Sequence, residues 1–351
     1  MIQEITAENA ISYLRENQQL AADESATAEG LAWGVSNVVI RIHREAGDDF
    51  VIKQSRKQLR TQAEWFSHLD RIWRELEVMQ ELGHLLPAGV VPRVLFEDRE
   101  NYLFAMEAID KDHQVWKAVL LDGKFDLNIA RELGDYLSAI HRNSFLNEKY
   151  QTQWGDWKIF DQLRIDPFYR FIVKAHPEIK TWVDDLINDM SAHRLCLVLA
   201  DFSPKNILIT DKAIHLVDFE TAHFGDPAFD LGFFLSHLLL KAVSFQRTGD
   251  GCIRLAEIFW DQYLNHGARL PLGEDPRIKQ MEDPELGMRT IRHLAACMLA
   301  RVDGKSTVDY LSGPMMQDQV RSFALSLILD PPASIPETIS RLNEMLKSGV
   351  Q

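Results

Sequence analysis

The chain has 351 residues, of which 46% are apolar and 26% are charged, so it is long enough for two domains or for two lobes that share a cleft. Its net charge of −14 argues against general nucleic-acid binding, which depends on basic surface. No apolar run approaches the length of a membrane span, and the N-terminus lacks the basic start and apolar core of a secretion signal. Three widely spaced cysteines (Cys196, Cys252 and Cys297) fit a cytoplasmic protein without a disulfide framework or a zinc knuckle.

The first third of the chain is expected to be rich in strands. Residues 1–16 predict an amphipathic helix with Thr6 as its N-cap. Alternating apolar and polar residues predict one strand pair within 34–55 and another within 90–109, and residues 62–82 between them have helical spacing. The order strand pair, helix, strand pair predicts a small lobe over residues 1–108.

The character of the sequence changes after Ile109, and residues 109–351 are expected to form a larger helical lobe. Its predicted helices are 126–145, 168–193, 229–245, 253–266, 288–302 and 334–349. The last of them begins with a capping box, Ser334 to Glu337. Two strand-like runs, 197–200 and 215–219, are interpreted as a hairpin around a polar loop. The fold class is therefore α+β, with two lobes.

This predicted hairpin carries polar side chains that a buried strand does not readily accept. Asp201 stands at the first bend, Asn206 follows five residues later, and Asp218 lies inside the second apolar run. An unpaired buried carboxylate is costly, so a metal ion is the first candidate to compensate it. The spacing is that of the catalytic loop of phosphoryl-transfer enzymes, in which the first Asp accepts the hydroxyl proton. Asn206 and Asp218 offer hard oxygen ligands for Mg²⁺.

Upstream residues supply a matching nucleotide site in the expected order. Lys53 in FVIKQS would hold the phosphates of ATP, and Glu75 on the following helix is placed to pair with it, although Glu77 and Glu81 share that helix. The segment GLAWGVSN stands where a nucleotide-covering loop belongs. Further candidate nucleotide contacts are Gly34, Ser36, Asn37, Met106 and Ala108.

From about residue 25 to residue 310 the chain resembles the aminoglycoside phosphotransferase and choline kinase superfamily, the small-molecule relatives of protein kinases. The most specific stretches are LADFSPKNILI and LVDFETAHFGDPAFDLGFFLSHLL. The resemblance implies a protein-kinase-like fold, ATP and Mg²⁺ as cofactors, and transfer of the γ-phosphoryl group to a small-molecule hydroxyl. It also implies that Asp230 braces the catalytic loop, and Asp230, Ser203 and Arg301 are candidates for contact with the substrate.

Three positions depart from the pattern of protein kinases or of the superfamily. Leu199 replaces the His that usually precedes the catalytic Asp by two residues, which puts the rigidity of the loop in question. Glu220 stands where protein kinases carry the Gly of their metal-binding motif, and Ala200 replaces an Arg beside the catalytic Asp. The residues Glu220 and Ala200 favour a small-molecule kinase over a protein kinase.

Other interpretations remain open at this point. Asp201 and Asn206 are also typical turn residues, Lys53 could be an ordinary edge-strand lysine, and Arg301 with its neighbours Asp303 and Lys305 could belong to an ordinary loop. His141, His223 and His237 are read as structural residues. A competing function is a catalytically inactive, nucleotide-binding scaffold. The acceptor could be an amino sugar, methylthioribose, an amino alcohol or another metabolite, and the protein is expected to be a monomer or a homodimer.

Overall fold

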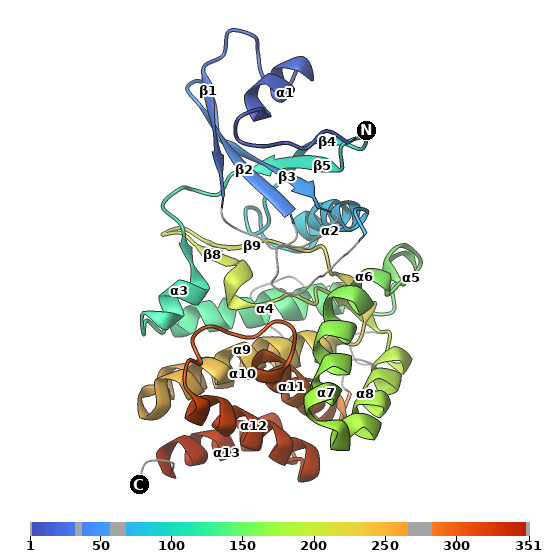
Figure 1. Ribbon diagram of the computed structural model, residues 1–351, viewed down its shortest axis with the longest axis vertical. Coiled ribbons are helices and arrows are strands. Elements are labelled where there is room, and N and C mark those ends of the chain that lie inside the picture. The colour runs from blue at the N-terminus through green and yellow to red at the C-terminus, as the bar shows by residue number, and fades with distance from the viewer. Residues whose placement is uncertain (1, 32–36, 57–67, 266–282, 349–351) are drawn as a thin grey trace. The chain divides into compact units, whose positions relative to one another are not determined.

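The computed structural model describes every residue except 1, 32–36, 57–67, 266–282 and 349–351 (Figure 1). Contacts divide the chain into two compact units. Unit 1 comprises Met1–His113 with Leu208–Thr221, and unit 2 comprises Gln114–Ile207 with Ala222–Gln351. The lobe boundary at residue 108 stays a prediction. The chain crosses between the two units more than once, because residues 208–221 return to unit 1. A single boundary in the sequence cannot describe this division.

Unit 1 is built on a five-stranded antiparallel sheet in the order β1-β2-β3-β5-β4. Its strands are β1 (Ala26–Gly30), β2 (Asn37–Arg44), β3 (Phe50–Ser55), β4 (Val94–Asp98) and β5 (Leu103–Glu107). The two predicted strand pairs are confirmed. The edge strand β1 was not predicted, because its sequence ATAEG lacks an apolar alternation and most of it is exposed. Lys53 lies in the central, fully buried strand β3, where it pairs with Val39 and Phe104.

Helix α1 (Ala10–Glu16) covers part of this sheet, and it is shorter than predicted. Its N-cap residue is Asn9 and not Thr6; the Asn9 side chain accepts a hydrogen bond from the Thr6 N–H at 2.8 Å. The segment before Asn9 is a turn. The sequence places Ile5, Ala10, Ile11 and Leu14 on one side of this segment. Ile5, Ala10 and Leu14 are buried in one cluster with side chains of the sheet, and the partly buried Ile11 packs against that cluster.

Helix α2 (Arg71–Leu85) contacts strands β3, β4 and β5. The predicted apolar stripe is buried at Ile72, Leu76, Met79 and Leu82. Phe66, which the sequence places at the start of this stripe, lies outside the described residues. The helix also buries Glu75, whose position on α2 directs it toward the sheet and β3.

The predicted hairpin between residues 197–200 and 215–219 is wrong. In unit 2, β7 (Cys196–Val198) pairs with the antiparallel strand β10 (His223–Gly225). The strand β8 (Ile207–Ile209) instead pairs with β9 (Ile214–Leu216), which belongs to unit 1. The left-handed conformation of Ala200, with φ of 59°, ends the extended backbone after β7. Asp218 consequently lies beyond the end of β9 and not inside a strand.

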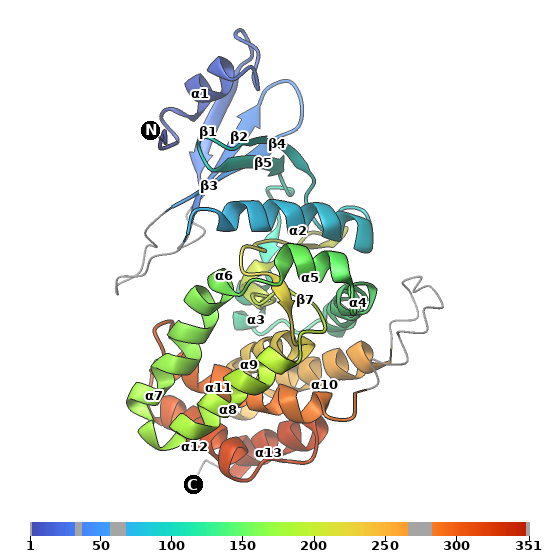
Figure 2. The same cartoon turned by 90° about the vertical axis from the view of Figure 1, so that its right-hand side faces the viewer.

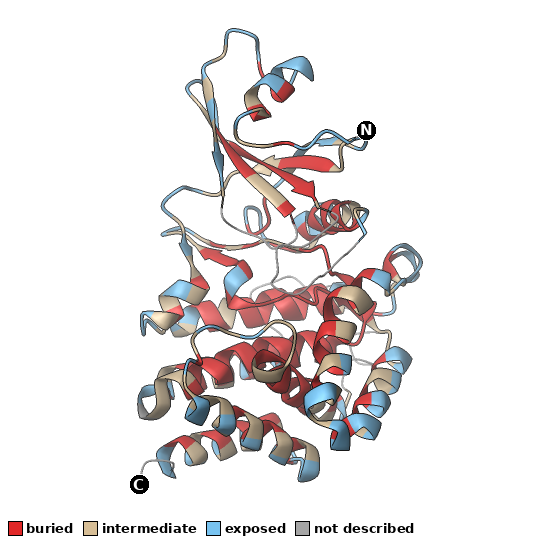
Figure 3. Cartoon of the chain, viewed as in Figure 1, coloured by how far each residue is buried: buried red, intermediate tan, exposed pale blue. Residues whose placement is uncertain are grey.

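Unit 2 is helical around the central helix α9 (Pro227–Phe245), in which every residue from Pro227 to Val243 is buried (Figure 3). The other elements of this unit are β6 (Gln114–Val115), α3 (Trp116–Leu121), α4 (Leu127–Asn143), α5 (Glu148–Trp154), α6 (Lys158–Phe160), η4 (Gln246–Thr248), α10 (Asp250–Leu264), α11 (Leu286–Asp303), α12 (Pro314–Leu329) and α13 (Ile335–Ser348), together with those named below. The predicted capping box of α13 is present in part, since the Glu337 N–H donates to the Ser334 hydroxyl at 3.3 Å.

Helix α9 packs closely on α11, and Gly232 permits that approach. A Cβ atom at this position would lie 2.6 Å from the Cβ of His293. Among the described residues, α9 is also the one helix that is long and apolar enough to cross a membrane, and 89% of its most apolar stretch is buried inside the protein. This burial is that of a core helix.

The single helix predicted over 168–193 is divided into four pieces. A π-helix, η1 (Asp161–Arg170), leads into α7 (Phe171–Ala175), and a 3₁₀ turn, η2 (Pro177–Ile179), separates α7 from α8 (Lys180–Ala192). Proline lacks an N–H donor, so Pro177 breaks the helix and Pro167 favours a widened π-helical turn. Figure 2 shows these helices, in green, along one side of unit 2.

Candidate active site

Asp201 lies in the loop that follows β7, and it is buried. The η3 turn (Pro204–Asn206) follows at once and bends the chain back, so that the Asn206 side chain donates to the backbone carbonyl of Asp201 at 3.0 Å. The predicted pair Asp201 and Asn206 is therefore brought together by one hydrogen bond. Ser203, in the same loop, is fully buried, and its hydroxyl has no partner among the described residues.

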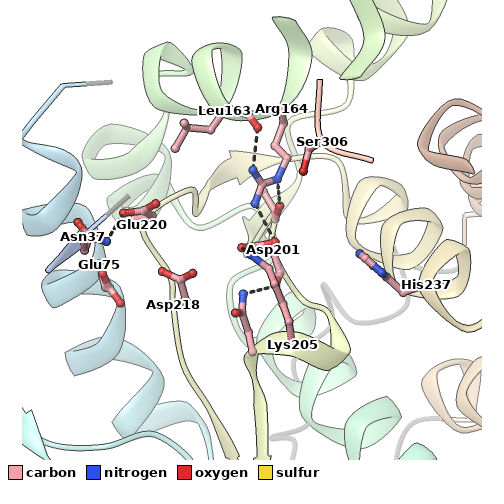
Figure 4. Close-up of polar contacts among 12 residues, drawn as sticks. Asn37, Glu75, Leu163, Arg164, Asp201, Lys205, Asp218, Glu220, His237 and Ser306 are labelled. Atoms are coloured by element: carbon pink, nitrogen blue, oxygen red, sulfur yellow. Dashed lines mark hydrogen bonds and ion pairs between the residues drawn. The ribbon is translucent and has the colours of Figure 1, made fainter. Parts of the chain in front are cut away.

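Two cationic side chains converge on the Asp201 carboxylate (Figure 4). An Arg164 nitrogen lies 2.8 Å from one carboxylate oxygen, and the Lys205 ammonium lies 2.8 Å from the other. Arg164 also donates to the Ala200 carbonyl at 2.6 Å. No sequence motif identifies Arg164, which reaches the loop from the π-helix η1.

Asp230 holds the same loop from the side of α9. Its two carboxylate oxygens accept the backbone N–H groups of Leu199 and Ala200, each at 2.7 Å. His141 lies 3.2 Å from the same carboxylate and 2.9 Å from the Tyr263 hydroxyl. Asp230 has no exposed surface and both of its oxygens are engaged, so of its two predicted roles the geometry supports bracing the loop and not contact with a substrate.

In unit 1, Lys53 joins two of the predicted acidic residues. Its ammonium group lies 2.7 Å from Glu75 and 2.8 Å from Asp218. Burial would lower the pKa of Lys53, but the charges of Asp218 and Glu75 outweigh it and hold that pKa above its ordinary value. Burial raises the pKa of Glu75 to about 7 in spite of the attraction of Lys53. Of the three acids on α2, Glu75 is the one that pairs with Lys53.

Glu220 adds a third carboxylate to this group. It accepts hydrogen bonds from Asn37 at 2.8 Å and from Arg71 at 3.1 Å, and Figure 4 shows its contact with Asn37. Oxygen atoms of Glu75, Asp218 and Glu220 all lie within 4.8 Å of one another. One oxygen of Glu75 is buried without a partner among the described residues. Such a set of hard oxygens fits a divalent cation like Mg²⁺.

Glu220 was noted in the sequence only as a difference from protein kinases. Its position two residues after Asp218 was the signal that could have identified it. Asp218 has a left-handed backbone, with φ of 72°, which is uncommon for a residue other than glycine and is typical of functional loops.

The remaining nucleotide candidates fall into two groups. Gly34 and Ser36 lie outside the described residues. Met106 lies at the end of β5, opposite Val51 and Val94, and Ala108 follows the strand, where its N–H donates to the Asp49 carbonyl at 3.4 Å. Both are partly buried. Their contact with a nucleotide stays a prediction.

The three residues that the sequence grouped in a loop lie at the end of α11, which holds Arg301 and Asp303, and just after it, where Lys305 follows. Asp303 is paired with Arg321 at 2.8 Å and Lys305 with Asp166 at 3.2 Å, as expected for an ordinary loop. Arg301 differs, because it is buried. A cavity of about 1070 Å³ elsewhere in unit 2 is lined by residues of α4, α10, α11 and α13, and it includes none of the candidate residues.

The fold of the chain is that of kinases that act on small molecules. Over 96% of its length it is similar to a choline/ethanolamine kinase family protein of Mesorhizobium loti, with a TM-score of 0.52, 18% identity and 99% of that chain covered. It is also similar to choline kinase of Cryptosporidium parvum, with a TM-score of 0.57 and 14% identity over 98% of this chain and 100% of the other.

The family model described as "Phosphotransferase enzyme family" matches residues 27–272, and the chain belongs to this family. A methylthioribose kinase of Pectobacterium atrosepticum is 25% identical over 264 residues, which are 67% of this chain and 66% of that protein. A methylthioribose kinase of Yersinia pestis is 26% identical over 264 residues, 67% of this chain and 64% of its own. The match thus spans slightly less than two thirds of the length of these curated relatives.

Proposed function

We propose that the protein is an ATP- and Mg²⁺-dependent phosphotransferase that moves the γ-phosphoryl group of ATP to a hydroxyl of a small molecule. The observation that carries this proposal is the contact of Lys53 with both Glu75 and Asp218, at 2.7 and 2.8 Å. In phosphoryl transfer a lysine of this kind holds the phosphates, and an adjacent carboxylate holds the metal.

The proposed roles follow from the chemistry of each side chain. Lys53, oriented by Glu75, binds phosphate oxygens of ATP. Asp218 and Asn206 are the proposed Mg²⁺ ligands, and bound Mg²⁺ would neutralise charge on the phosphates. Asp201 orients the acceptor hydroxyl and receives its proton.

The reaction then breaks the bond between the γ-phosphorus and the β–γ bridging oxygen and forms a bond from phosphorus to the acceptor oxygen. ADP leaves with the electron pair of the broken bond, and the hydroxyl proton passes to Asp201. Arg164 and Lys205 fix the orientation of the Asp201 carboxylate through their two ion pairs. We also propose that the protein acts in the cytoplasm, where its three buried, unpaired cysteines stay reduced.

The competing function is a nucleotide-binding scaffold without catalysis, for which Leu199 is the supporting feature. Its backbone nevertheless keeps the hydrogen bond to Asp230 that holds the loop. Thermal melting with ATP alone and with ATP and Mg²⁺ separates the two functions. Stabilisation by ATP that requires Mg²⁺, followed by ATP consumption with an acceptor from a panel of amino sugars, pentose derivatives and amino alcohols, supports the kinase. Stabilisation indifferent to Mg²⁺, with no consumption, supports the scaffold.

A further inference from the structure

Unit 2 buries three cationic side chains, which we call the cation cluster: Arg164, Arg301 and Lys241. One of them, Arg164, contacts Asp201. The three side chains are 8%, 7% and 1% exposed. They come from three elements, η1, α11 and α9, so no local sequence motif brings them together.

Shared neighbours join the three side chains. Both guanidinium groups lie over the same two rings: that of Arg301 is 4.7 Å from Phe168 and 5.4 Å from Phe233, and that of Arg164 is 5.6 and 5.5 Å from them. Arg301 and Lys241 meet at His237, because Arg301 contacts the ring Nε2 at 3.3 Å and Lys241 donates to the backbone carbonyl at 3.2 Å.

His237 supplies no negative charge to this group, and it is neutral. Its Nε2 must accept the hydrogen bond from Arg301, because a guanidinium can only donate. Burial and the positive charge of Arg301 lower the pKa of His237 well below its ordinary value, in agreement with this geometry. The imidazole therefore bridges two cations without compensating either.

The cation cluster has fewer negative charges than positive ones. Asp201 contacts Arg164 but is shared with Lys205. Among the described residues, no carboxylate lies within 4.0 Å of Arg301 or Lys241, whereas Arg289, on the same helix as Arg301, pairs with both Asp226 and Asp283. An uncompensated buried charge is costly. The chain as a whole has a net charge of −14, so its composition does not explain this local excess of positive charge.

Two buried polar atoms beside the cluster are also without a partner among the described residues. They are the Nε of Arg301 and the hydroxyl of Tyr310. The Tyr310 ring lies 5.0 Å from the Lys241 ammonium. Arg301 donates through Nη1 to the Ser306 backbone carbonyl and hydroxyl, at 2.9 and 3.0 Å, and through Nη2 to His237. Its guanidinium is therefore held in place while its Nε–H is unused.

From this geometry we infer that the acceptor carries an anionic group, a carboxylate or a phosphate, which binds to the cation cluster while a hydroxyl of the same molecule is presented to Asp201. Guanidinium groups bind both kinds of oxyanion through paired hydrogen bonds. The inference rests on the proposed function, and it disfavours cationic acceptors such as amino sugars and amino alcohols. The alternative is that the cluster serves the phosphates of ATP, and the experiment below distinguishes the two.

The test uses four related probes on the full chain: glucose, glucosamine, gluconate and glucose 6-phosphate. Binding is measured by calorimetry without ATP, and phosphoryl transfer is measured with Mg²⁺ and ATP. We expect gluconate or glucose 6-phosphate to bind at least ~10-fold more tightly than glucose, because one charge-assisted hydrogen bond lowers a dissociation constant by about that factor. Which of the two binds identifies the anionic group as a carboxylate or a phosphate. Glucosamine should bind most weakly.

The variant Arg301→Gln should lose this preference, whereas Arg301→Lys, which keeps the charge, should retain part of it. Arg292→Gln is the matched control, since Arg292 lies on the same helix α11 and pairs with Asp189 at 2.7 Å. It should bind the anion as the wild type does. Melting temperatures of all variants show whether each is folded.

The outcomes separate this inference from the proposed function. Anion binding that depends on Arg301 supports the inference even if no probe is phosphorylated. The inference is wrong if neither anion binds more tightly than glucose, or if Arg301→Gln weakens only the binding of Mg²⁺ and ATP. Transfer to glucose or glucosamine that is unaffected by Arg301→Gln would confirm a kinase and overturn the anionic acceptor.

Discussion

Lys241 shows most clearly what a single buried charge costs this protein. Burial lowers the pKa of Lys241 to about 7, and titratable groups face it from every neighbouring element: Lys117 on α3, Cys252 on α10, Arg301 on α11, and Asp309 in the loop after α11. Of these, the Cys252 thiol is neutral, because burial raises its pKa to about 12. His237, on the same helix as Lys241, is also neutral. An apolar residue of similar length should therefore be tolerated better than lysine.

We predict that Lys241→Met raises the free energy of unfolding at pH 7 by roughly 1–4 kcal/mol, the range seen when buried ionic groups are replaced by apolar ones. Between pH 7 and the ordinary lysine pKa of about 10.4, the unfolded wild type keeps a proton that the folded wild type has lost, so its stability rises with pH. The difference in free energy of unfolding between the variant and the wild type should therefore shrink as the pH rises through this window. Denaturant unfolding at several pH values measures it. A variant less stable at pH 7 would contradict the account.

The second residue-scale prediction concerns Leu199→His, which introduces the residue usual in the superfamily. Leu199 is 2% exposed, and its backbone N–H is bonded to Asp230. A buried imidazole without partners costs on the order of 1–3 kcal/mol. We expect a lower melting temperature and no gain in turnover. A wild type inactive on every acceptor, together with a variant that gains Mg²⁺-dependent transfer, would instead indicate a decayed enzyme.

At the scale of elements, the π-helix η1 determines where Arg164 points. Its widened turns contain Pro167, and they carry Arg164 to the Ala200 carbonyl and to Asp201. π-Helical turns occur often at functional sites. Arg164 is thus a positioning residue for the loop, and its effect should appear in turnover and not in nucleotide binding.

We predict that Arg164→Gln lowers kcat on the order of ten- to a hundredfold, since small misplacements of a catalytic group cost about this much. The KM for ATP should be unchanged, and Arg164→Lys should restore part of kcat. Steady-state kinetics with both variants test this. An equal loss of kcat in the Gln and Lys variants together with a raised KM for ATP would assign Arg164 to the nucleotide site.

The sequence predicted those helices and strands that carry a clear apolar periodicity within their own residues. The helices α4, α9, α10, α11 and α13 were expected from their apolar spacing, and so were the two strand pairs of the sheet. The edge strand β1 and the helix α12 (Pro314–Leu329) lack comparable signals. The pairing of β7 with β10 could not be read from the sequence, because short strands receive their partners from tertiary packing.

The same limit applies to the site. Lys53, Glu75 and Asp218 were predicted together from their order along the chain, and Asn206 from its spacing to Asp201. Arg164, Glu220 and Arg71 were missed, because each acts through contacts with residues distant in sequence. The excess of positive charge around Arg301 is a property of three packed elements and is invisible in a chain that is acidic as a whole.

For the whole molecule, the account requires that nucleotide binding depends on a metal. We predict that Asp218→Ala abolishes the additional rise in melting temperature that Mg²⁺ produces with ATP, because the variant lacks a carboxylate ligand. Asp211→Ala, an exposed aspartate seven residues earlier, is the control and should respond as the wild type does. An undiminished Mg²⁺ effect in Asp218→Ala would show that Asp218 is not a ligand.

The most direct test of the central claim is phosphoryl transfer itself, measured by mass spectrometry of the acceptor after incubation with Mg²⁺ and ATP labelled with ¹⁸O in the γ-phosphoryl group. The wild type should produce an acceptor that carries the labelled group. Asp201→Asn should slow its formation at least ~100-fold, as for loss of a general base, while ATP affinity changes little. Transfer by Asp201→Asn within a few-fold of the wild type, or ATP hydrolysis with no labelled acceptor, would contradict the account.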